Sequence, residues 1–235
     1  VTPYGQTVED CVLQDIVDQL ADDAEYAKRR TAIEAFNADS PVIKRGIALT
    51  PVKFGISFNT TFLNQAGALV HVYTDGSVHL NHGGTEMGQG LNTKVAQIVA
   101  HEFQIDFDAI KITATTTGKV PNTSATAASS GTDLNGMAAQ TAARTIKTRM
   151  TTHLAGLHEC AAEDVIFSEG MVRAGAVRLS FAEAVKACYM GRVSLSSTGY
   201  YATPKIHWDS ARARGRPFYY LSLIHISEPT RHTDI

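Results

Sequence analysis

Hydrophobic residues recur every three to four positions in several stretches of the chain, which is the spacing of one face of an α-helix. Within residues 7–37, for example, Val8, Val12, Ile16 and Leu20 recur every four residues, with acidic residues between them. Because the residue before a proline avoids the helical region, we expect two helices here that end before Pro41. Thr7, followed by Asp10, resembles the capping pattern of the first helix. The same spacing predicts three further helices, over residues 91–103, 134–157 and 181–190, the last capped by Ser180.

Between these segments, short runs of β-branched and aromatic residues indicate strands. The clearest pair flanks Asp75-Gly76, a dipeptide that accepts the positive φ angles of a tight hairpin turn. A second hairpin is predicted around Glu169-Gly170, and residues 115–133, which lack periodicity, are expected to form a loop. Helices and strands alternate irregularly, so we expect an α+β fold with mixed sheets, hairpins and packed helices. The remaining strand-like runs are residues 47–49, 54–58 and 110–114.

Charge and composition narrow the partners of the chain. The formal net charge is −2 at pH 7, and no apolar run approaches the roughly 20 residues that span a bilayer. We therefore expect neither a nucleic-acid nor a membrane partner. The three cysteines, Cys11, Cys160 and Cys188, are far apart and odd in number. They predict buried thiols in a reducing cytoplasm, and neither disulfides nor a cysteine metal site.

The two ends of the chain are expected to be unusual. The first residues, Val1-Thr2-Pro3, show neither an initiator Met nor a signal pattern, which is typical of a sequence that begins inside a longer protein. The start of residues 221–235 is similar to a translated transposase adaptor used in sequencing libraries, although a natural strand with a polar tail is the alternative. We therefore expect residues 1–220 to be part of one domain, and residues 221–235 to be a non-native tail.

A glycine-rich run, His82 to Gly90, follows the first predicted hairpin and precedes a predicted helix. Its glycines allow close approach of a ligand, and its backbone N–H groups are suited to cradle an anion or a polar ring. The Gln89 amide both donates and accepts hydrogen bonds. The run fits neither nucleotide-loop motif, so a tight turn without ligand is an equal alternative. His82 and Glu86 lie four residues apart without a third metal ligand, so we expect structural roles for both and no metal site.

A second loop, residues 120–133, concentrates small residues and hydroxyl groups. Such a stretch is suited to a surface on which a flat, polar heterocycle lies against backbone. A flexible Ser/Thr/Ala linker is the alternative. Pro121 and the long helix that follows favour an anchored loop.

Several segments together resemble the molybdopterin-binding part of the xanthine dehydrogenase family of molybdenum hydroxylases. The resemblance covers roughly residues 1–220, is most specific over residues 51–136, and is strongest to the bacterial form with separate subunits. The segments that carry it are Phe54–Phe58, Phe62–Ser77, His82–Gly90, Val120–Ser124, Ser194–Ser196, Gly199–Tyr201, Thr203–Pro204 and Gly215–Phe218.

The resemblance implies hydroxylation of xanthine or hypoxanthine, towards uric acid, at a molybdenum–molybdopterin cofactor. It also implies 2Fe-2S clusters and FAD on a partner subunit or domain, NAD as electron acceptor, a hetero-oligomer and a cytoplasmic location. An aldehyde oxidase-type hydroxylase and a catalytically inert truncated scaffold are the alternatives.

The resemblance also assigns individual positions. It implies that a purine ring packs against Phe58, with Asn59 in a place where the family more often has Thr. The residues implied to contact substrate are Phe58, Asn59, Thr60 and Leu63. Those implied to contact the cofactor are Gly88, Gln89, Thr126, Ala127, Ala128 and Ser129, with Ala128 the surest match.

No catalytic residue is assigned within the chain. The resemblance implies that the base glutamate lies downstream of Tyr220, and that the glutamate and arginine that orient the purine lie upstream of Val1. Glu86, Glu102 and Glu183 are therefore not candidates for the base.

These expectations predict that the isolated 235-residue chain does not oxidise xanthine. The reason is that the general base and the purine-orienting groups are expected outside it. An assay for uric acid tests this, and formation of uric acid by the chain alone would contradict it.

Overall fold

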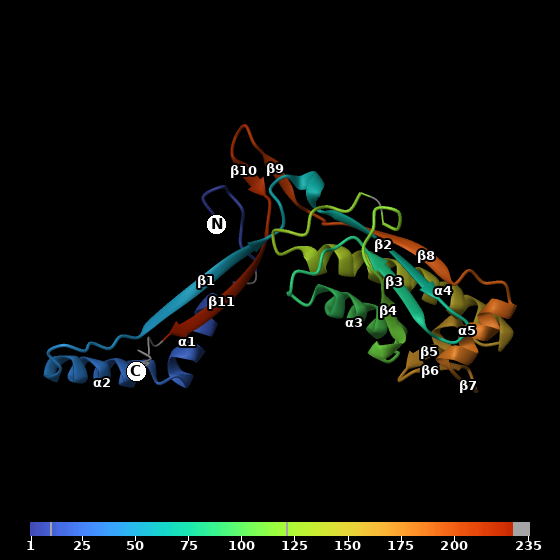
Figure 1. Ribbon diagram of the computed structural model, residues 1–235, viewed down its shortest axis with the longest axis horizontal. Helices are drawn as coiled ribbons and strands as arrows, with labels where there is room; N and C mark the ends of the chain where they lie inside the picture. The colour runs from blue at the N-terminus through green and yellow to red at the C-terminus, as the bar shows by residue number, and fades with distance from the viewer. Residues whose placement is uncertain (10, 121, 228–235) are drawn as a thin grey trace. The chain divides into compact units, whose positions relative to one another are not determined.

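The computed structural model describes residues 1–9, 11–120 and 122–227, which form two compact units (Figure 1). The larger unit contains residues 57–207, and the smaller one combines residues 1–56 with the chain from Trp208 onward. Several sheets and five α-helices within the described residues confirm the expected α+β fold.

A four-stranded sheet with strand order β4-β3-β2-β8 organises the larger unit. The predicted hairpin is confirmed as β2 (Gln65–Val72) and β3 (Val78–His82), which pair antiparallel. β4 (Ile110–Ile112) runs parallel to β3, and β8 (Ser196–Ala202) runs antiparallel to β2. Alternate residues of β2 are buried, because successive side chains of a strand point to opposite faces of the sheet.

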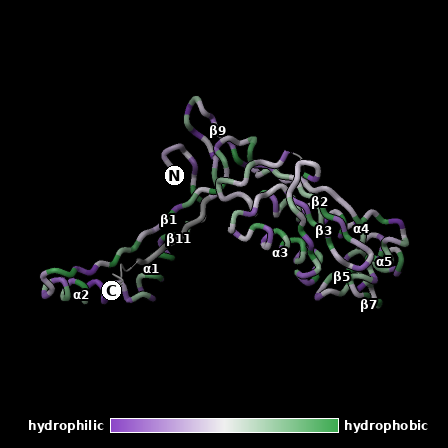
Figure 2. The backbone as a smooth tube through the Cα atoms, viewed as in Figure 1, coloured by the Kyte–Doolittle hydropathy of each residue, from purple (hydrophilic) through white to green (hydrophobic). Residues whose placement is uncertain are grey.

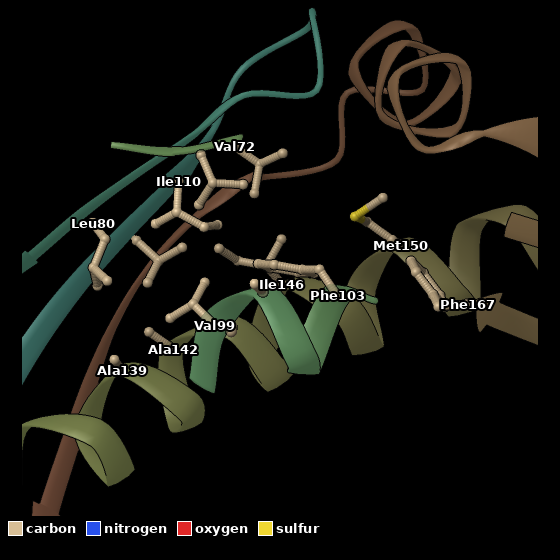
Figure 3. Close-up of a cluster of buried hydrophobic side chains, with 14 of the residues drawn as sticks. Val72, Leu80, Val99, Phe103, Ile110, Ala139, Ala142, Ile146, Met150 and Phe167 are labelled. Carbon is tan, nitrogen blue, oxygen red and sulfur yellow. The ribbon is translucent and has the colours of Figure 1, made fainter. Parts of the chain in front are cut away.

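Two helices pack against the sheet, α3 (Leu91–Phe103) and α4 (Gly131–Leu157). Hydrophobic and hydrophilic residues are interspersed along α3 (Figure 2), and its buried positions share one face. The core that the sheet and helices enclose is shown in Figure 3 and includes Val72, Leu80, Val99, Phe103, Ile110, Ala139, Ala142, Ile146 and Met150. This packing places the amino ends of both helices in the same unit as the loops that precede them.

The contact between α4 and β8 leaves no room for a side chain at Gly199. A Cβ atom there would lie 2.0 Å from the carbonyl oxygen of Ala138 and 2.6 Å from the nitrogen of Ala142. Both atoms belong to the α4 backbone, so they cannot rotate away. A run of small residues on α4 therefore lies directly against the sheet.

The rest of the larger unit is a three-stranded antiparallel sheet followed by α5 (Phe181–Met190). The second predicted hairpin is confirmed, and Ser180 caps α5 as expected, with Glu183 completing a capping box. The ring centroids of Phe103 and Phe181 lie 5.6 Å apart, so α5 packs against the end of α3 in the main core. The sheet consists of β5 (Val165–Ser168), β6 (Met171–Ala174) and β7 (Val177–Ser180), and the short 3-10 helices are η1 (Thr61–Leu63), η2 (Phe107–Ala109) and η3 (Ala162–Asp164).

The smaller unit pairs strands from opposite ends of the described chain. β1 (Ala48–Ile56) and β11 (Tyr219–Ser227) form a two-stranded antiparallel sheet. The Tyr4 ring makes edge contacts with Trp208 and Phe218, at centroid distances of 6.0 and 6.2 Å. The helices of this unit are α1 (Leu13–Asp23) and α2 (Tyr26–Asp39), and its short hairpin is β9 (His207–Asp209) with β10 (Arg214–Arg216).

Several expectations differ from the structure. α1 begins at Leu13 with Val12 as its N-cap residue, so the predicted cap at Thr7 is wrong, and Asp10 lies outside the described residues. Residues 47–49 and 54–58 were expected as separate strands, whereas one strand, β1, spans Ala48–Ile56. β7, β8, β9 and β10 were not predicted.

The cysteine expectation holds for one residue of three. Cys188 is buried, and burial raises the pKa of its thiol to about 11. Cys160 is half-buried and Cys11 is exposed, so neither is the fully buried thiol that was expected.

β11 includes part of the segment expected to be non-native, and its backbone pairs with β1 as far as Ser227. The boundary at Tyr220 stays a prediction, and residues 228–235 lie outside the described residues. No helix in the described part of the chain is long and apolar enough to cross a membrane.

Replacement of Gly199 by Ala is expected to destabilise the chain by about 3 kcal/mol, because its Cβ would meet the rigid α4 backbone. The matched control is Gly156→Ala, at an exposed position of α4 with open space around the new Cβ. That change should be neutral or stabilising by up to about 1 kcal/mol. Urea denaturation of both variants tests the difference, and equal stabilities would contradict the close contact.

Candidate functional site

The first half of the loop between β3 and α3 is buried and tightly packed. The Nδ1 atom of His82 accepts a hydrogen bond of 3.1 Å from the N–H group of Gly84. A Cβ atom on Gly83 would lie 2.2 Å from the hydroxyl of Thr123, and one on Gly84 would lie 2.6 Å from Leu91. Gly83 therefore leaves no room for a side chain, and at Gly84 the neighbouring side chains would have to move to admit one.

The second half of the loop folds around the carboxylate of Glu86. One oxygen accepts from the N–H groups of Gly88 and Gly90, and the other accepts from that of Asn92, each at 3.0 Å. The N–H group of Asn92, with those of Gly90 and Gly88, lowers the pKa of the Glu86 carboxyl. The structural roles expected for His82 and Glu86 are therefore confirmed. However, these amides were expected to be open to a ligand, and Glu86 occupies them instead.

The Gln89 side chain is held in place by its own loop. Its Oε1 accepts from the N–H group of Met87 at 2.6 Å, and its Nε2 donates to the carbonyl of Thr85 at 2.9 Å. The Lys94 ammonium donates to the carbonyl of Gln89 at 3.0 Å. Gln89 therefore has a defined orientation although it is exposed.

The second loop is anchored to the first, as expected. The hydroxyl of Thr126 accepts a 2.8 Å hydrogen bond from the N–H group of Thr85. Ala128 and Ser129 both adopt positive φ angles, 53° and 54°, which are uncommon for residues other than glycine. The carbonyl of Ala128 accepts from the N–H group of Ser57 at 3.2 Å. The flexible-linker alternative is therefore not what the structure shows.

The two loops enclose a pocket of about 350 Å³ at the amino ends of α3 and α4. Four residues expected to contact the cofactor line it, namely Gln89, Thr126, Ala127 and Ser129. Gly88 and Ala128 are not among its lining residues, although both belong to the same two loops. The remaining lining residues, which were not predicted, are Met87, Leu91, Lys94, Gly131 and Thr132.

The polar groups of this pocket favour an anionic or hydrogen-bonding ligand. Lys94 is the charged side chain among its lining residues, and no Asp or Glu is among them. Thr126, Ser129 and Thr132 add hydroxyl groups. Among the described residues there is also no group of three or more His, Cys, Asp or Glu side chains placed to hold a metal ion.

The residues expected to contact substrate lie on the segment that follows β1. The buried side chain of Asn64 clasps this segment, because it accepts from the N–H group of Phe58 and donates to its carbonyl, both at 2.8 Å. Phe58 and Leu63 are half-buried. Asn59 and Thr60 are exposed, and none of the four lines the 350 Å³ pocket. The Ser57–Ala128 hydrogen bond nevertheless attaches the start of this segment to the second loop.

His82 is expected to make the stability of the chain depend on pH. Burial lowers the pKa of its imidazole, partly opposed by Asn92 and the charge of Glu86. Below the unfolded pKa of about 6.5, the unfolded chain therefore binds a proton at this histidine more readily than the folded chain does, so stability falls as pH drops below about 6.5.

The variant His82→Asn, which retains an acceptor, should reduce this slope by up to about 1.4 kcal/mol per pH unit. His101→Gln, at an exposed position of α3, is the control and should leave it unchanged. Denaturation between pH 5 and 8 (roughly the range in which His titrates) tests the prediction, and an unchanged slope in His82→Asn would contradict it.

Comparisons with known proteins identify the family of this chain. The chain is 44% identical over 222 residues to xanthine dehydrogenase of Oryza sativa subsp. japonica and 40% identical over 222 residues to xanthine dehydrogenase/oxidase of Gallus gallus. Each match covers 94% of this chain, which spans about 15% of the length of either relative.

Solved structures share the fold at lower sequence identity. Quinoline 2-oxidoreductase from Pseudomonas putida 86 matches with a TM-score of 0.71 and 18% identity, over 94% of this chain and 28% of that one. Reconstituted CO dehydrogenase from Oligotropha carboxidovorans matches with a TM-score of 0.73 and 20% identity, over 92% of this chain and 28% of that one. The model of the molybdopterin cofactor-binding domain family matches residues 19–230, and the chain therefore belongs to this family.

Proposed function

We propose that this chain forms one wall of the molybdopterin site in a molybdenum hydroxylase that oxidises xanthine and hypoxanthine to uric acid. The observation that carries the proposal is the 350 Å³ pocket, which brings Gln89 together with Thr126, Ala127 and Ser129. The family match and the xanthine dehydrogenase relatives at 40–44% identity support it. These relatives also favour purine oxidation over aldehyde oxidation.

The pocket fits the organic part of this cofactor in size and in chemistry. Its volume falls within the roughly 300–1,000 Å³ of typical ligand sites. Molybdopterin combines a flat ring system, rich in donors and acceptors, with an anionic phosphate. The Gln89 amide and the backbone of the second loop would bind the ring edges, while Lys94 and Thr132 would bind the phosphate. The bound cofactor supplies the oxygen transfer and the electron chemistry.

In this proposal, residues of this chain hold and orient the cofactor and the substrate. A base outside the chain carries out the proton transfer of the reaction. Phe58 would pack against the purine, which adds about 0.5–1.5 kcal/mol beyond simple burial. The Asn64 side chain holds the backbone on both sides of the Phe58 Cα atom, which would place this residue for the substrate. Asn59 would contact the substrate through its backbone, and Thr60 and Leu63 would line the access channel.

The complete protein requires partners that accept electrons. We propose 2Fe-2S clusters and FAD on a separate subunit or domain, NAD as the acceptor, a hetero-oligomeric assembly and a cytoplasmic location. The names of the curated relatives support the reaction class. The part of those relatives that this chain does not span leaves room for such domains.

The cofactor assignment is tested in the complete protein with Ala127→Leu, which places a larger side chain in the pocket. Overpacking costs about 1–3 kcal/mol, so cofactor retention should fall about tenfold or more. Ala125→Leu, on the same loop at an exposed position that does not line the pocket, is the matched control and should retain the cofactor.

The readouts are molybdenum by elemental analysis and the pterin by fluorescence after oxidation. Full retention of both in Ala127→Leu would contradict the placement of the cofactor. Uric acid formation by the control, with no turnover of aldehydes, would support the purine reaction specifically.

A further inference from the structure

The carboxylate of Glu86 is an anion supplied by the chain itself at the amino end of α3. Its three donors, the N–H groups of Gly88, Gly90 and Asn92, surround the start of that helix. Helix amino ends attract anions through such unpaired N–H groups and the helix dipole. Since Glu86 is exposed, water and dissolved anions can reach this place, and the internal carboxylate competes with them.

The same hydrogen bonds determine where Gln89 lies. Gly88 and Gly90, on either side of it, have φ angles of 97° and 74° and both donate to one oxygen of Glu86. The backbone at Gln89 is therefore drawn around the carboxylate. The contacts of the Gln89 side chain with Thr85 and Met87 then complete a closed loop.

The amino end of α4, on the other side of the pocket, is arranged differently. The Ser130 hydroxyl donates to the carbonyl of Ala127 and does not cap the helix. Gly131 and Thr132 line the pocket, and among the described residues no acceptor contacts their N–H groups. At the α3 end a carboxylate of the chain thus occupies the amides. At the α4 end the acidic residue of the first turn, Asp133, is not among the residues that line the pocket, whereas Gly131, Thr132 and Lys94 are.

We infer that Glu86 is a positioning residue that closes the α3 end to anions and thereby holds Gln89 in the pocket. The anionic end of the ligand is directed to the α4 side, where Lys94 lies. The consequence of this role for cofactor binding rests on the proposed function. The occupation of the α3 amides by Glu86 is independent of which ligand the pocket takes.

Inorganic phosphate is the probe for the first part of the inference. In the 235-residue chain, the amide resonances of Gly88, Gly90 and Asn92 should be insensitive to phosphate, because Glu86 occupies these donors. In Glu86→Ala the same amides should respond saturably, with an apparent affinity at least about tenfold higher than any response of the unchanged chain would allow. Added acetate should compete with phosphate in the variant and restore the original amide positions.

Glu183→Ala is the matched control, because it removes a carboxylate that caps α5 in the same unit. It should leave the three amides insensitive to phosphate, which separates a specific effect from general loss of stability. Glu86→Gln, which keeps the size and one acceptor oxygen, should show the phosphate response with a smaller affinity gain. It decides the question if Glu86→Ala does not fold. The inference would be overturned if the three amide resonances of a folded Glu86 variant did not respond to phosphate. It would also be overturned if those of the unchanged chain responded equally.

The second part is measured in the complete protein as pterin and molybdenum content. Glu86→Ala should lower retention about tenfold, the size typical of losing a residue that orients a ligand without contacting it, and Glu183→Ala should not. A phosphate response with unchanged cofactor content would overturn the link to the cofactor and leave the closed α3 end established. If pocket-filling Ala127→Leu also retains cofactor, the proposed function fails and the amide result still stands.

Discussion

The close contact between α4 and the four-stranded sheet is the constraint on which the candidate site depends. Gly199 of β8 lies so near the α4 backbone that even a methyl group would overlap the carbonyl of Ala138. The two helices also lie close together, since a Cβ atom on Gly136 would lie 2.5 Å from the terminal side-chain carbon of Ile98 on α3. Through these contacts α4 packs closely against both the sheet and α3. The loops that precede the helices therefore meet, and the pocket lies where they meet.

Distribution of charge then gives this pocket its chemical character. The exposed carboxylate of the first loop, Glu86, is turned into the amides of α3. The cation Lys94 bonds the carbonyl of Gln89 and lines the pocket. Both groups stabilise the loop, yet they leave the cavity with a positive lining and several hydroxyl groups. A ligand with a polar ring and an anionic end is the kind of molecule that this lining suits.

Local sequence signals predicted the elements whose structure is decided locally. The hairpin turns at Asp75-Gly76 because glycine accepts its φ angle of 86°, and Ser180 begins α5 because its side chain and Glu183 satisfy the first amides. β8 was missed because its sequence, Ser-Ser-Thr-Gly-Tyr-Tyr-Ala, lacks alternating apolar residues. Pairing with β2 and the contact of Gly199 with α4 hold it in place, and both come from distant parts of the chain.

The candidate site, like the fold, could be predicted from the sequence only in part. The glycine-rich run and the second loop are recognisable from composition and from their resemblance to a known family. Lys94 and Leu91 gave no such signal, because they occupy ordinary positions in the first turn of a helix. The use of the α3 amides by Glu86 was also missed, since only the folded loop brings the carboxylate back onto residues that follow it.

The most direct test of the central claim is an experimental structure of the complete protein loaded with its cofactor. We expect pterin density in the pocket between the two loops, with ring atoms within about 3.2 Å of hydrogen-bonding groups of Gln89 and the second loop. Its phosphate should lie on the side of Lys94 and Thr132. Pterin density elsewhere, with this pocket filled by water alone, would contradict the account.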